Sequence, residues 1–223
     1  MSRFTHASSP PSAEPKPRRA GKGGRPSKAR ESAISDEILD LACEMFASQG
    51  YAATSVERLA IACRVGKDTI YRRFPSKRAL FNAAVERLRV RVLSRLEDVT
   101  ADGGPAIDRL RRTARWFLAI NLEPELVALR RIACSEAVLS NDAPGRVQPD
   151  PIMERLIDVV RQAQAEGAIT GFEPDFLAAQ LIHAVASGPS NDAMLGRKSY
   201  ATVEAQDAYF EKAWSLFLKG AAS

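Results

Sequence analysis

This sequence contains few cysteines, few histidines and no long apolar run, and each scarcity argues against a class of protein. The 223 residues include three cysteines, Cys43, Cys63 and Cys134, and two histidines, His6 and His183. An odd number of widely spaced cysteines argues against a disulfide framework, and none of these residues has the spacing of a metal-binding motif. We therefore expect no structural metal and three small, buried cysteines in a reducing compartment, with a redox-sensing thiol as the alternative.

No stretch has the length and composition of a membrane span. The longest uncharged stretch, 176–191, contains Gln180, His183 and Pro189 and falls short of the roughly 20 apolar residues that cross a bilayer. The first ten residues contain no apolar core of a secretory signal. Catalytic motifs are also missing, since there is no GxSxG, no glycine-rich phosphate loop and no convincing pair of carboxylates. We expect a cytoplasmic protein that is not an enzyme and has no cofactor.

Basic residues are concentrated at the N-terminus. The net charge is +5, and residues 1–34 contain eight Lys and Arg against two Glu, whereas residues 79–223 contain seventeen basic and nineteen acidic residues. The segment is rich in Pro, Ser and Gly and poor in large apolar residues, which predicts a disordered basic arm over residues 1–33. Such an arm indicates a polyanionic partner, either nucleic acid or an anionic membrane surface. The chain lacks the basic amphipathic helix with aromatic anchors that membrane binding needs.

From Ile34 onward the apolar residues follow a helical period. Ser35 suits the N-cap of a first helix, and Gly50 suits the αL position that ends it. Thr54 and Glu57 form a capping box for a second, short helix that stops near Cys63. Further helices are expected at 67–74, 77–99, 105–121, 124–139, 150–166, 174–187 and 203–219, with a break at 187–189 before the last. No segment alternates with a period of two, so we predict an all-α fold of about nine helices, with an N-terminal three-helix domain (34–80) and a C-terminal helical domain (81–223).

The second and third helices have the length and spacing of a helix-turn-helix, whose second member lies in the DNA major groove. If Ile70 and Phe74 face inward, the third helix presents polar and basic side chains outward: Lys67, Asp68, Thr69, Tyr71, Arg72 and Arg73. The long helix that follows has an arginine-rich outer face (Arg87, Arg89, Arg91 and Arg95). Such a face is usually solvated, and phosphate binding is the alternative.

Many residues at fixed offsets over about 33–80 resemble the DNA-binding domain of the TetR family of bacterial transcriptional regulators. They are Phe46-Ala47-x-x-Gly50-Tyr51-x-x-Thr54-Ser55 and Leu59-Ala60-x-x-x-x-Val65-x-x-x-Thr69-Ile70-Tyr71-x-x-Phe74-x-x-Lys77. The C-terminal half has a more diffuse resemblance to AefR-like C-terminal domains, through Pro124-Glu125-Leu126 and the Ala163 to Gly167 spacing. The resemblance implies a homodimer that binds a double-stranded DNA operator and responds to a small-molecule effector.

The resemblance also implies roles for individual residues. Tyr71, Arg73 and Lys77 match phosphate contacts, and Thr54 or Ser55 lies where the second helix meets the DNA backbone. Base-proximal positions are occupied by Lys67, Asp68 and Arg72, with Lys67 suited to guanine and Asp68 to cytosine. Two residues depart from the family pattern: Arg64 stands where the turn usually has Gly, and Gly66 where the third helix usually has a Ser cap. A positive φ in this turn would be costlier for Arg64 than for Gly.

The sequence predicts roles for three further groups of residues. Gly24-Arg25-Pro26 resembles an AT-hook core, in which Arg25 enters the minor groove, and nonspecific phosphate affinity is the alternative. An effector pocket could be lined by Trp116, Phe117, Ile120, Ile132, Phe176 and His183, although ordinary core has the same composition. A dimer interface is expected at Phe210, Ala213, Trp214 and Phe217 on the last helix. The function predicted is that of a ligand-responsive repressor on a pseudo-palindromic operator, and the alternative is an architectural DNA-binding protein without an effector.

Overall fold

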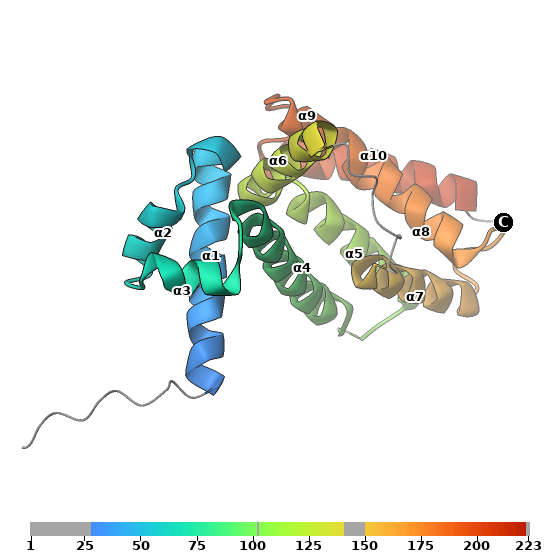
Figure 1. The fold of residues 1–223 in the computed structure, drawn as a ribbon. Helices are drawn as coiled ribbons and strands as arrows, with labels where there is room; N and C mark the ends of the chain where they lie inside the picture. The colour runs from blue at the N-terminus through green and yellow to red at the C-terminus, as the bar shows by residue number, and fades with distance from the viewer. Residues whose placement is uncertain (1–27, 102, 141–149, 222–223) are drawn as a thin grey trace, which may run out of the picture.

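The computed structural model describes residues 28–101, 103–140 and 150–221, and every regular element in these ranges is helical (Figure 1). The N-terminal helices α1, α2 and α3 form one unit, and the long α4 joins it to a bundle of the remaining helices. The helices are α1 (Lys28–Ala53), α2 (Val56–Ala62), α3 (Lys67–Arg73), α4 (Lys77–Ala101), α5 (Ala106–Ile120), α6 (Pro124–Ser140), α7 (Pro151–Ala165), α8 (Pro174–Ile182), a π-helical turn (His183–Ser187), α9 (Gly188–Met194) and α10 (Val203–Ala221). The all-α prediction is confirmed.

The N-terminal unit is built around the aromatic side chain of Phe46. This ring is fully buried, stacks on Tyr51 with centroids 5.8 Å apart, and meets the edge of Phe81 from α4 at 5.1 Å. Leu59 of α2 and Ile70 of α3 are buried in the same core. Because α4 supplies one wall of this core and continues into the C-terminal bundle, the two parts share a helix.

The first helix starts earlier than predicted. α1 begins at Lys28, so residues 28–33 are helical and do not belong to the arm, while Arg25 lies outside the described residues. The prediction that Ser35 is the N-cap was wrong. Ser35 lies inside the helix, where its hydroxyl donates to the carbonyl of Glu31 one turn earlier, 3.0 Å away. The break at Gly50 is confirmed, but the predicted αL conformation is wrong, because a φ of 79° with a ψ of 169° lies in an extended, glycine-favouring region.

The predicted break at 187–189 does not occur. α8 runs through the π-helical turn directly into α9, and Gly188 has a helical φ of −60°. Pro189 therefore lies within a continuous helical run and has no N–H to donate to a preceding carbonyl; the carbonyl of Ala184, five residues earlier, accepts from the Tyr209 hydroxyl at 2.7 Å. Gly188 and Pro189, which the sequence predicts to break the helix, lie inside this helical run.

The cysteines divide into two kinds. Cys43 and Cys63 are buried as predicted, but Cys134 on α6 is exposed, which corrects that part of the expectation. The Cys43 thiol donates to the carbonyl of Ala84, 3.1 Å away, and burial raises its pKa to about 11, so the reactive thiolate is disfavoured. Within the described ranges no helix meets the length and hydrophobicity of a membrane span, and no group of three or more His, Cys, Asp or Glu forms a metal site.

Candidate DNA-binding site

The turn between α2 and α3 has the geometry of a helix-turn-helix. α2 is followed by Arg64, whose φ of 53° is the only positive value at a non-glycine residue in the described chain. The N–H of Val65 then donates to the carbonyl of Ala60 at 3.0 Å, which closes the α2 terminus. Gly66 is the N-cap of α3 in an extended conformation and makes no side-chain capping bond. Both departures from the family pattern are thus accommodated, with the conformational cost falling on Arg64.

The start of α2 differs from the predicted capping box. Ser55, not Thr54, is the N-cap, and its hydroxyl accepts from the N–H of Arg58 at 3.3 Å. Thr54 is buried, with its hydroxyl 2.7 Å from the carbonyl of Gly50. Thr54 therefore closes the end of the first helix from the interior, and Ser55 is the more exposed of the two residues.

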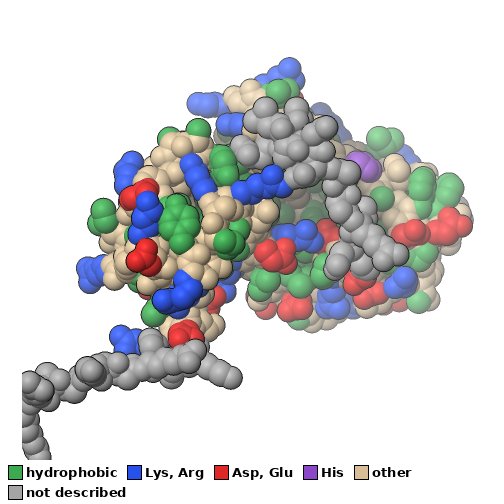
Figure 2. Space-filling view, in the orientation of Figure 1, with side chains coloured by type: hydrophobic (Ala, Val, Ile, Leu, Met, Phe, Trp, Pro, Cys, Tyr) green, Lys and Arg blue, Asp and Glu red, His purple; other side chains and the backbone are tan. Residues whose placement is uncertain are grey.

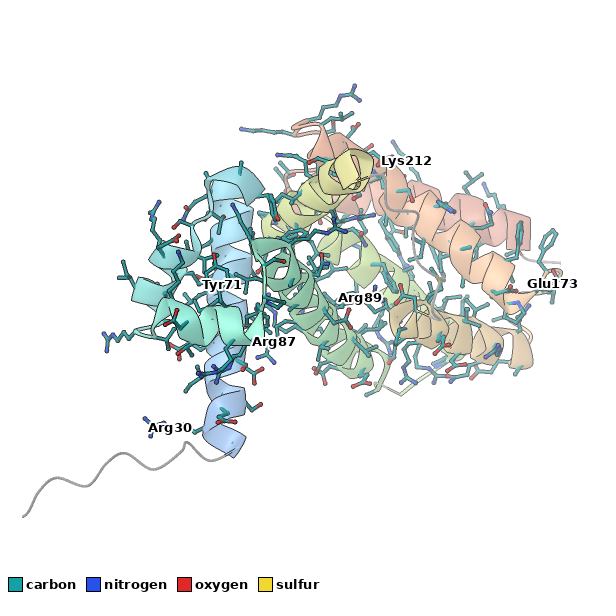
Figure 3. The ribbon with its side chains drawn as sticks, viewed as in Figure 1. Arg30, Tyr71, Arg87, Arg89, Glu173 and Lys212 are labelled. Atoms are coloured by element: carbon teal, nitrogen blue, oxygen red, sulfur yellow. The ribbon has the colours of Figure 1, made fainter. Side chains whose placement is uncertain are left out.

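The outward face of α3 presents four exposed side chains: Lys67, Asp68, Tyr71 and Arg72. Ile70 points the opposite way and is 1% exposed, as the helical spacing predicts. Tyr71 is labelled on this face in Figure 3, and Figure 2 shows Lys and Arg side chains interspersed with acidic and apolar ones over α2 and α3. The face thus combines donors, acceptors and positive charge without a surrounding wall, which suits contact with a groove of DNA.

Lys67 is held in place by its neighbours in the protein. Its ammonium forms an ion pair with Glu57 of α2 and lies over the ring of Tyr71, 5.5 Å from the centroid. Glu57 also accepts a hydrogen bond from Ser55 at 2.8 Å. The bond from Lys67 lowers the pKa of Glu57 to about 2, so this carboxylate is ionised at neutral pH. Binding to a base would require Lys67 to exchange Glu57 for DNA.

The other side chains predicted to contact DNA are less exposed and also bind other parts of the N-terminal unit. Arg73 donates from Nε to the hydroxyl of Ser35 in α1 at 3.0 Å and from Nη1 to the carbonyl of Thr69 at 3.2 Å. Lys77 donates to the carbonyl of Ala52 at 3.0 Å and lies over the ring of Tyr51, 4.8 Å from its centroid. Arg73, Thr69 and Lys77 are half-buried, so they fix α3 against α1 in addition to any contact with phosphate.

The arginines of α4 form a partly solvated face, on which Arg89 and Arg95 are exposed and Arg87 and Arg91 are half-buried. Each forms an ion pair with another part of the chain, because α4 packs against α1, α5 and α7 and Arg91 reaches Glu125 at the start of α6. Figure 3 labels two of them, Arg87 and Arg89. The pairs are Arg87 with Asp36 (3.3 Å) and Asp40 (3.2 Å), Arg89 with Asp150 (3.0 Å), Arg91 with Asp40 (3.5 Å) and Glu125 (3.0 Å), and Arg95 with Glu123 (2.7 Å).

Arg91 connects the two parts of the molecule. Its Nη2 donates to both carboxylate oxygens of Glu125 in α6, each at 3.0 Å, and its Nη1 lies 3.5 Å from Asp40 in α1. The three side chains are about one-third exposed, which shields them partly from solvent screening. A shift of α6 relative to α1 would break one of these two ion pairs.

The residues predicted for an effector pocket do not come together. Phe117 and Ile120 are buried in the core of the C-terminal bundle, and Ile132 is half-buried on α6. Phe176 and His183 are exposed. Trp116 lines an open groove between α5 and α10. A helical spacing identifies which residues share a face, but it does not tell which neighbouring helix covers that face.

An apolar cavity of about 160 Å³ lies instead between α4, α6 and α7. None of the six predicted effector residues lines it. Its walls include Val85, Leu88, Val92, Leu126, Leu129 and Ile152, and Arg89 and Arg130 also line it. The signal in the sequence was the four-residue apolar spacing along 77–99, which indicated a buried face but not a cavity.

The residues predicted for the dimer interface are in the interior of the protomer. Phe210, Ala213, Trp214 and Phe217 are each at most 8% exposed, and they pack with α5 and α8. The large apolar side chains that α10 and the start of α8 leave exposed are different ones, among them Phe172, Phe176 and Leu216. The rings of Phe172 and Phe176 contact each other, with centroids 5.4 Å apart.

A helix-turn-helix with an open polar and basic face, joined through one long helix to a separate helical domain, defines a class: the DNA-binding regulators with an N-terminal helix-turn-helix. Family models place the chain within this class. The model for bacterial regulatory proteins of the tetR family matches residues 38–84, and the model for the C-terminal domain of AefR-like transcriptional repressors matches residues 108–220. The chain belongs to the TetR family of transcriptional regulators.

Individual relatives agree with this assignment. The chain is 26% identical over 193 residues to the nucleoid occlusion factor SlmA of Vibrio atlanticus (strain LGP32), covering 84% of this chain and 95% of the relative. A TetR-family regulator from Mesorhizobium loti MAFF303099 has the same fold, with a TM-score of 0.75, 24% identity and coverage of 87% and 99% of the two chains. The flavonoid-responsive regulator FrrA matches with a TM-score of 0.55 and 26% identity, covering 86% of this chain and 98% of FrrA.

Proposed function

We propose that this DNA-binding regulator is a repressor that binds a pseudo-palindromic operator as a dimer and is released by a small-molecule effector. The observation that carries the proposal is the face of α3, where Lys67, Asp68, Tyr71 and Arg72 are exposed together while Ile70 is buried. In this role Lys67, Asp68 and Arg72 read base edges, and Tyr71, Arg73, Lys77 and Ser55 contact phosphates. The protein acts in the cytoplasm, on the nucleoid.

Selection of bound duplexes from a random pool tests this proposal. A dimer with two recognition helices about 34 Å apart selects two inverted half-sites about one helical turn apart. A pool that shows no inverted repeat after selection, with equal affinity for all duplexes, would contradict the repressor and support an architectural DNA-binding protein.

The dimer forms in this proposal through the exposed faces of α8 and α10. The argument is that Phe172 and Phe176 are 51% and 47% exposed and Leu216 is 71% exposed, although all three are large apolar residues. In a two-fold interface each copy covers the same patch on the other, so a single apolar patch is sufficient. Phe210, Ala213, Trp214 and Phe217 support this surface from within the protomer.

The effector enters, in this proposal, the cavity between α4, α6 and α7. Its apolar lining suits a small apolar molecule or the apolar end of a larger one. The cavity wall contains Val92 and Leu126, the neighbours in sequence of Arg91 and Glu125, which form the ion pair between α4 and α6. A ligand that displaces α6 therefore acts on the contact that connects α6 to α1, and effector and operator oppose each other's binding. FrrA, one of the proteins that this chain resembles, is named a flavonoid-responsive regulator.

We expect Arg91→Gln to uncouple the two parts of the protein. Loss of the ion pairs to Asp40 and Glu125 should lower the stability of the DNA-binding unit by about 1 kcal/mol. Far-UV ellipticity reports unfolding of all helices, whereas tryptophan fluorescence reports only the C-terminal bundle, because Trp116 and Trp214 both lie there. The urea midpoint seen by ellipticity should fall below the midpoint seen by fluorescence.

Arg161→Gln is the matched control, since Arg161 forms an exposed ion pair with Asp158 one turn away on α7. It should leave both midpoints unchanged. Coincident, unshifted midpoints in Arg91→Gln would mean that Arg91 does not connect the two parts.

A role on the nucleoid that is independent of an effector is the second candidate. It is favoured by the similarity over most of the chain to proteins named nucleoid occlusion factor. The two candidates differ in where the protein binds along a chromosome. A few sites at promoters support the repressor, whereas many sites spread over the chromosome support the second candidate.

A further inference from the structure

We propose that the groove between α5 and α10 is a second ligand site, separate from the effector cavity, and that it takes a planar aromatic anion. The groove has a volume of about 520 Å³, within the range of small-molecule sites. Val99 at the C-terminal end of α4 closes one side of it. This inference does not depend on the repressor proposal, because its test measures ligand binding without DNA.

The apolar part of the groove is aromatic and rigid. Trp116 and Phe210 both line it. Trp116 is half-buried and meets the edge of Phe117, with ring centroids 5.1 Å apart. Phe210 stacks on Trp214 at 6.1 Å with an interplanar angle of 13°. The half-buried Trp116 ring offers a flat surface on which a ligand ring can stack at little entropic cost, and Phe210, which is 2% exposed, supports the groove from beneath.

The polar part of the groove is dominated by guanidinium groups. Arg111, Arg112 and Arg115 line it together with two carboxylates, Asp207 and Glu211. Two ion pairs cross from α5 to α10, Arg111 to Glu211 at 2.6 Å and Arg115 to Asp207 at 2.7 Å. Both carboxylates are therefore already neutralised, and a cationic ligand would find no free counter-charge among the described lining residues.

The guanidinium groups keep donors for an additional anion. Arg115 uses its Nε for Asp207, which leaves both terminal nitrogens, and Arg111 uses Nη2 for Glu211, which leaves Nε and Nη1. A guanidinium has five N–H donors in a fixed plane, which matches carboxylate and sulfonate oxygens and also stacks on rings. An aromatic ring on Trp116 with its anionic group toward Arg111 and Arg115 satisfies both parts of the groove.

Two dyes that differ by one charged group test the site on the full-length protein. The probe is 8-anilino-1-naphthalenesulfonate, and its partner without the sulfonate is N-phenyl-1-naphthylamine, both followed by fluorescence titration. We expect the sulfonate to bind one saturable site per protomer. Arg111→Gln and Arg115→Gln should each weaken the sulfonate about tenfold and leave the neutral dye within twofold, because only the charged group uses these donors. Trp116→Leu should weaken both dyes.

Glu211→Gln is expected to raise the affinity for the sulfonate dye, which the arginine variants lower. Removal of this carboxylate frees Arg111, so the sulfonate should bind about threefold more tightly while the neutral dye is unaffected. A residue with only a structural role would not increase affinity. Arg161→Gln, which removes an exposed arginine on α7, is the control and should change neither dye.

Two results would overturn the proposal. One is sulfonate affinity that stays within twofold of the wild type in both arginine variants while their far-UV spectra and thermal midpoints match the wild type. The other is loss of sulfonate binding in Ala133→Phe, which fills the cavity between α4, α6 and α7, because the dye would then occupy that cavity. If an arginine variant unfolds, Arg115→Lys keeps the charge and should show a partial, threefold loss for the sulfonate alone.

Discussion

Leu216→Asp is expected to convert the dimer into a monomer and to weaken operator binding by at least about a hundredfold. The substitution places a carboxylate in the centre of the proposed interface, and the two-fold axis brings two such charges together. A monomer holds a single half-site, so it loses the gain from simultaneous binding, which is roughly 10²–10⁴. Sedimentation at micromolar concentration and titration of the selected operator measure the two effects.

Leu195→Asp is the matched control for this experiment. Leu195 and Leu216 have the same exposed fraction, 71%, but Leu195 lies at the end of α9. It should leave the dimer and the operator affinity unchanged, which separates the interface from a general effect of added negative charge. A Leu216→Asp protein that remains dimeric would place the interface elsewhere on the molecule.

Lys67→Ala is expected to weaken binding to the selected operator by roughly 10- to 100-fold, a loss of about 1–3 kcal/mol, and to relax the preference at one position in each half-site. The reason is that Lys67 lies at the first position of α3 with its ammonium exposed beside Tyr71. Tyr71→Phe removes a hydroxyl but keeps the ring under Lys67, so it should weaken all duplexes alike, by about fivefold. Repeated selection with each variant distinguishes the two patterns.

Lys198→Ala is the control for Lys67→Ala, because Lys198 is an exposed lysine in the C-terminal part of the chain. It should change neither affinity nor preference. Glu57→Gln should strengthen binding to unrelated duplexes a fewfold, since it releases Lys67 from its ion pair and removes a negative charge near the DNA backbone. If Lys67→Ala and Tyr71→Phe give the same selected sequences as the wild type, Lys67 does not read a base.

The local features of the DNA-binding unit could be predicted from sequence because short-range rules determine them. The apolar spacing of α3 placed Ile70 inside and Lys67 outside, and the structure agrees. Gly66 was expected as a cap and is one, and Arg64, for which a positive φ was expected to be costly, has a φ of 53°. Turn geometry depends on a few neighbouring residues, so a sequence pattern contains nearly all the information that is needed.

The arginines of α4 illustrate what local rules miss. Their spacing indicated one outer face, and a solvated face is the common outcome. Their carboxylate partners lie 28 to 61 residues away in sequence, and nothing along α4 indicates them. Local rules also failed at Ser35. The sequence pattern predicted an N-cap there, but α1 already begins one to two turns earlier, at Lys28.

By itself, the sequence determined that the chain is helical, that α2 and α3 form a helix-turn-helix, and which side of α3 is exposed. Only the tertiary structure decided that Phe210, Ala213, Trp214 and Phe217 are core residues, that Phe176 and His183 are exposed, and that an apolar cavity lies between α4, α6 and α7. The physical reason is that an apolar stripe shows that a helix face avoids water, because burial of any apolar surface is favourable. The stripe does not specify whether its own protomer, a second copy or a ligand covers it.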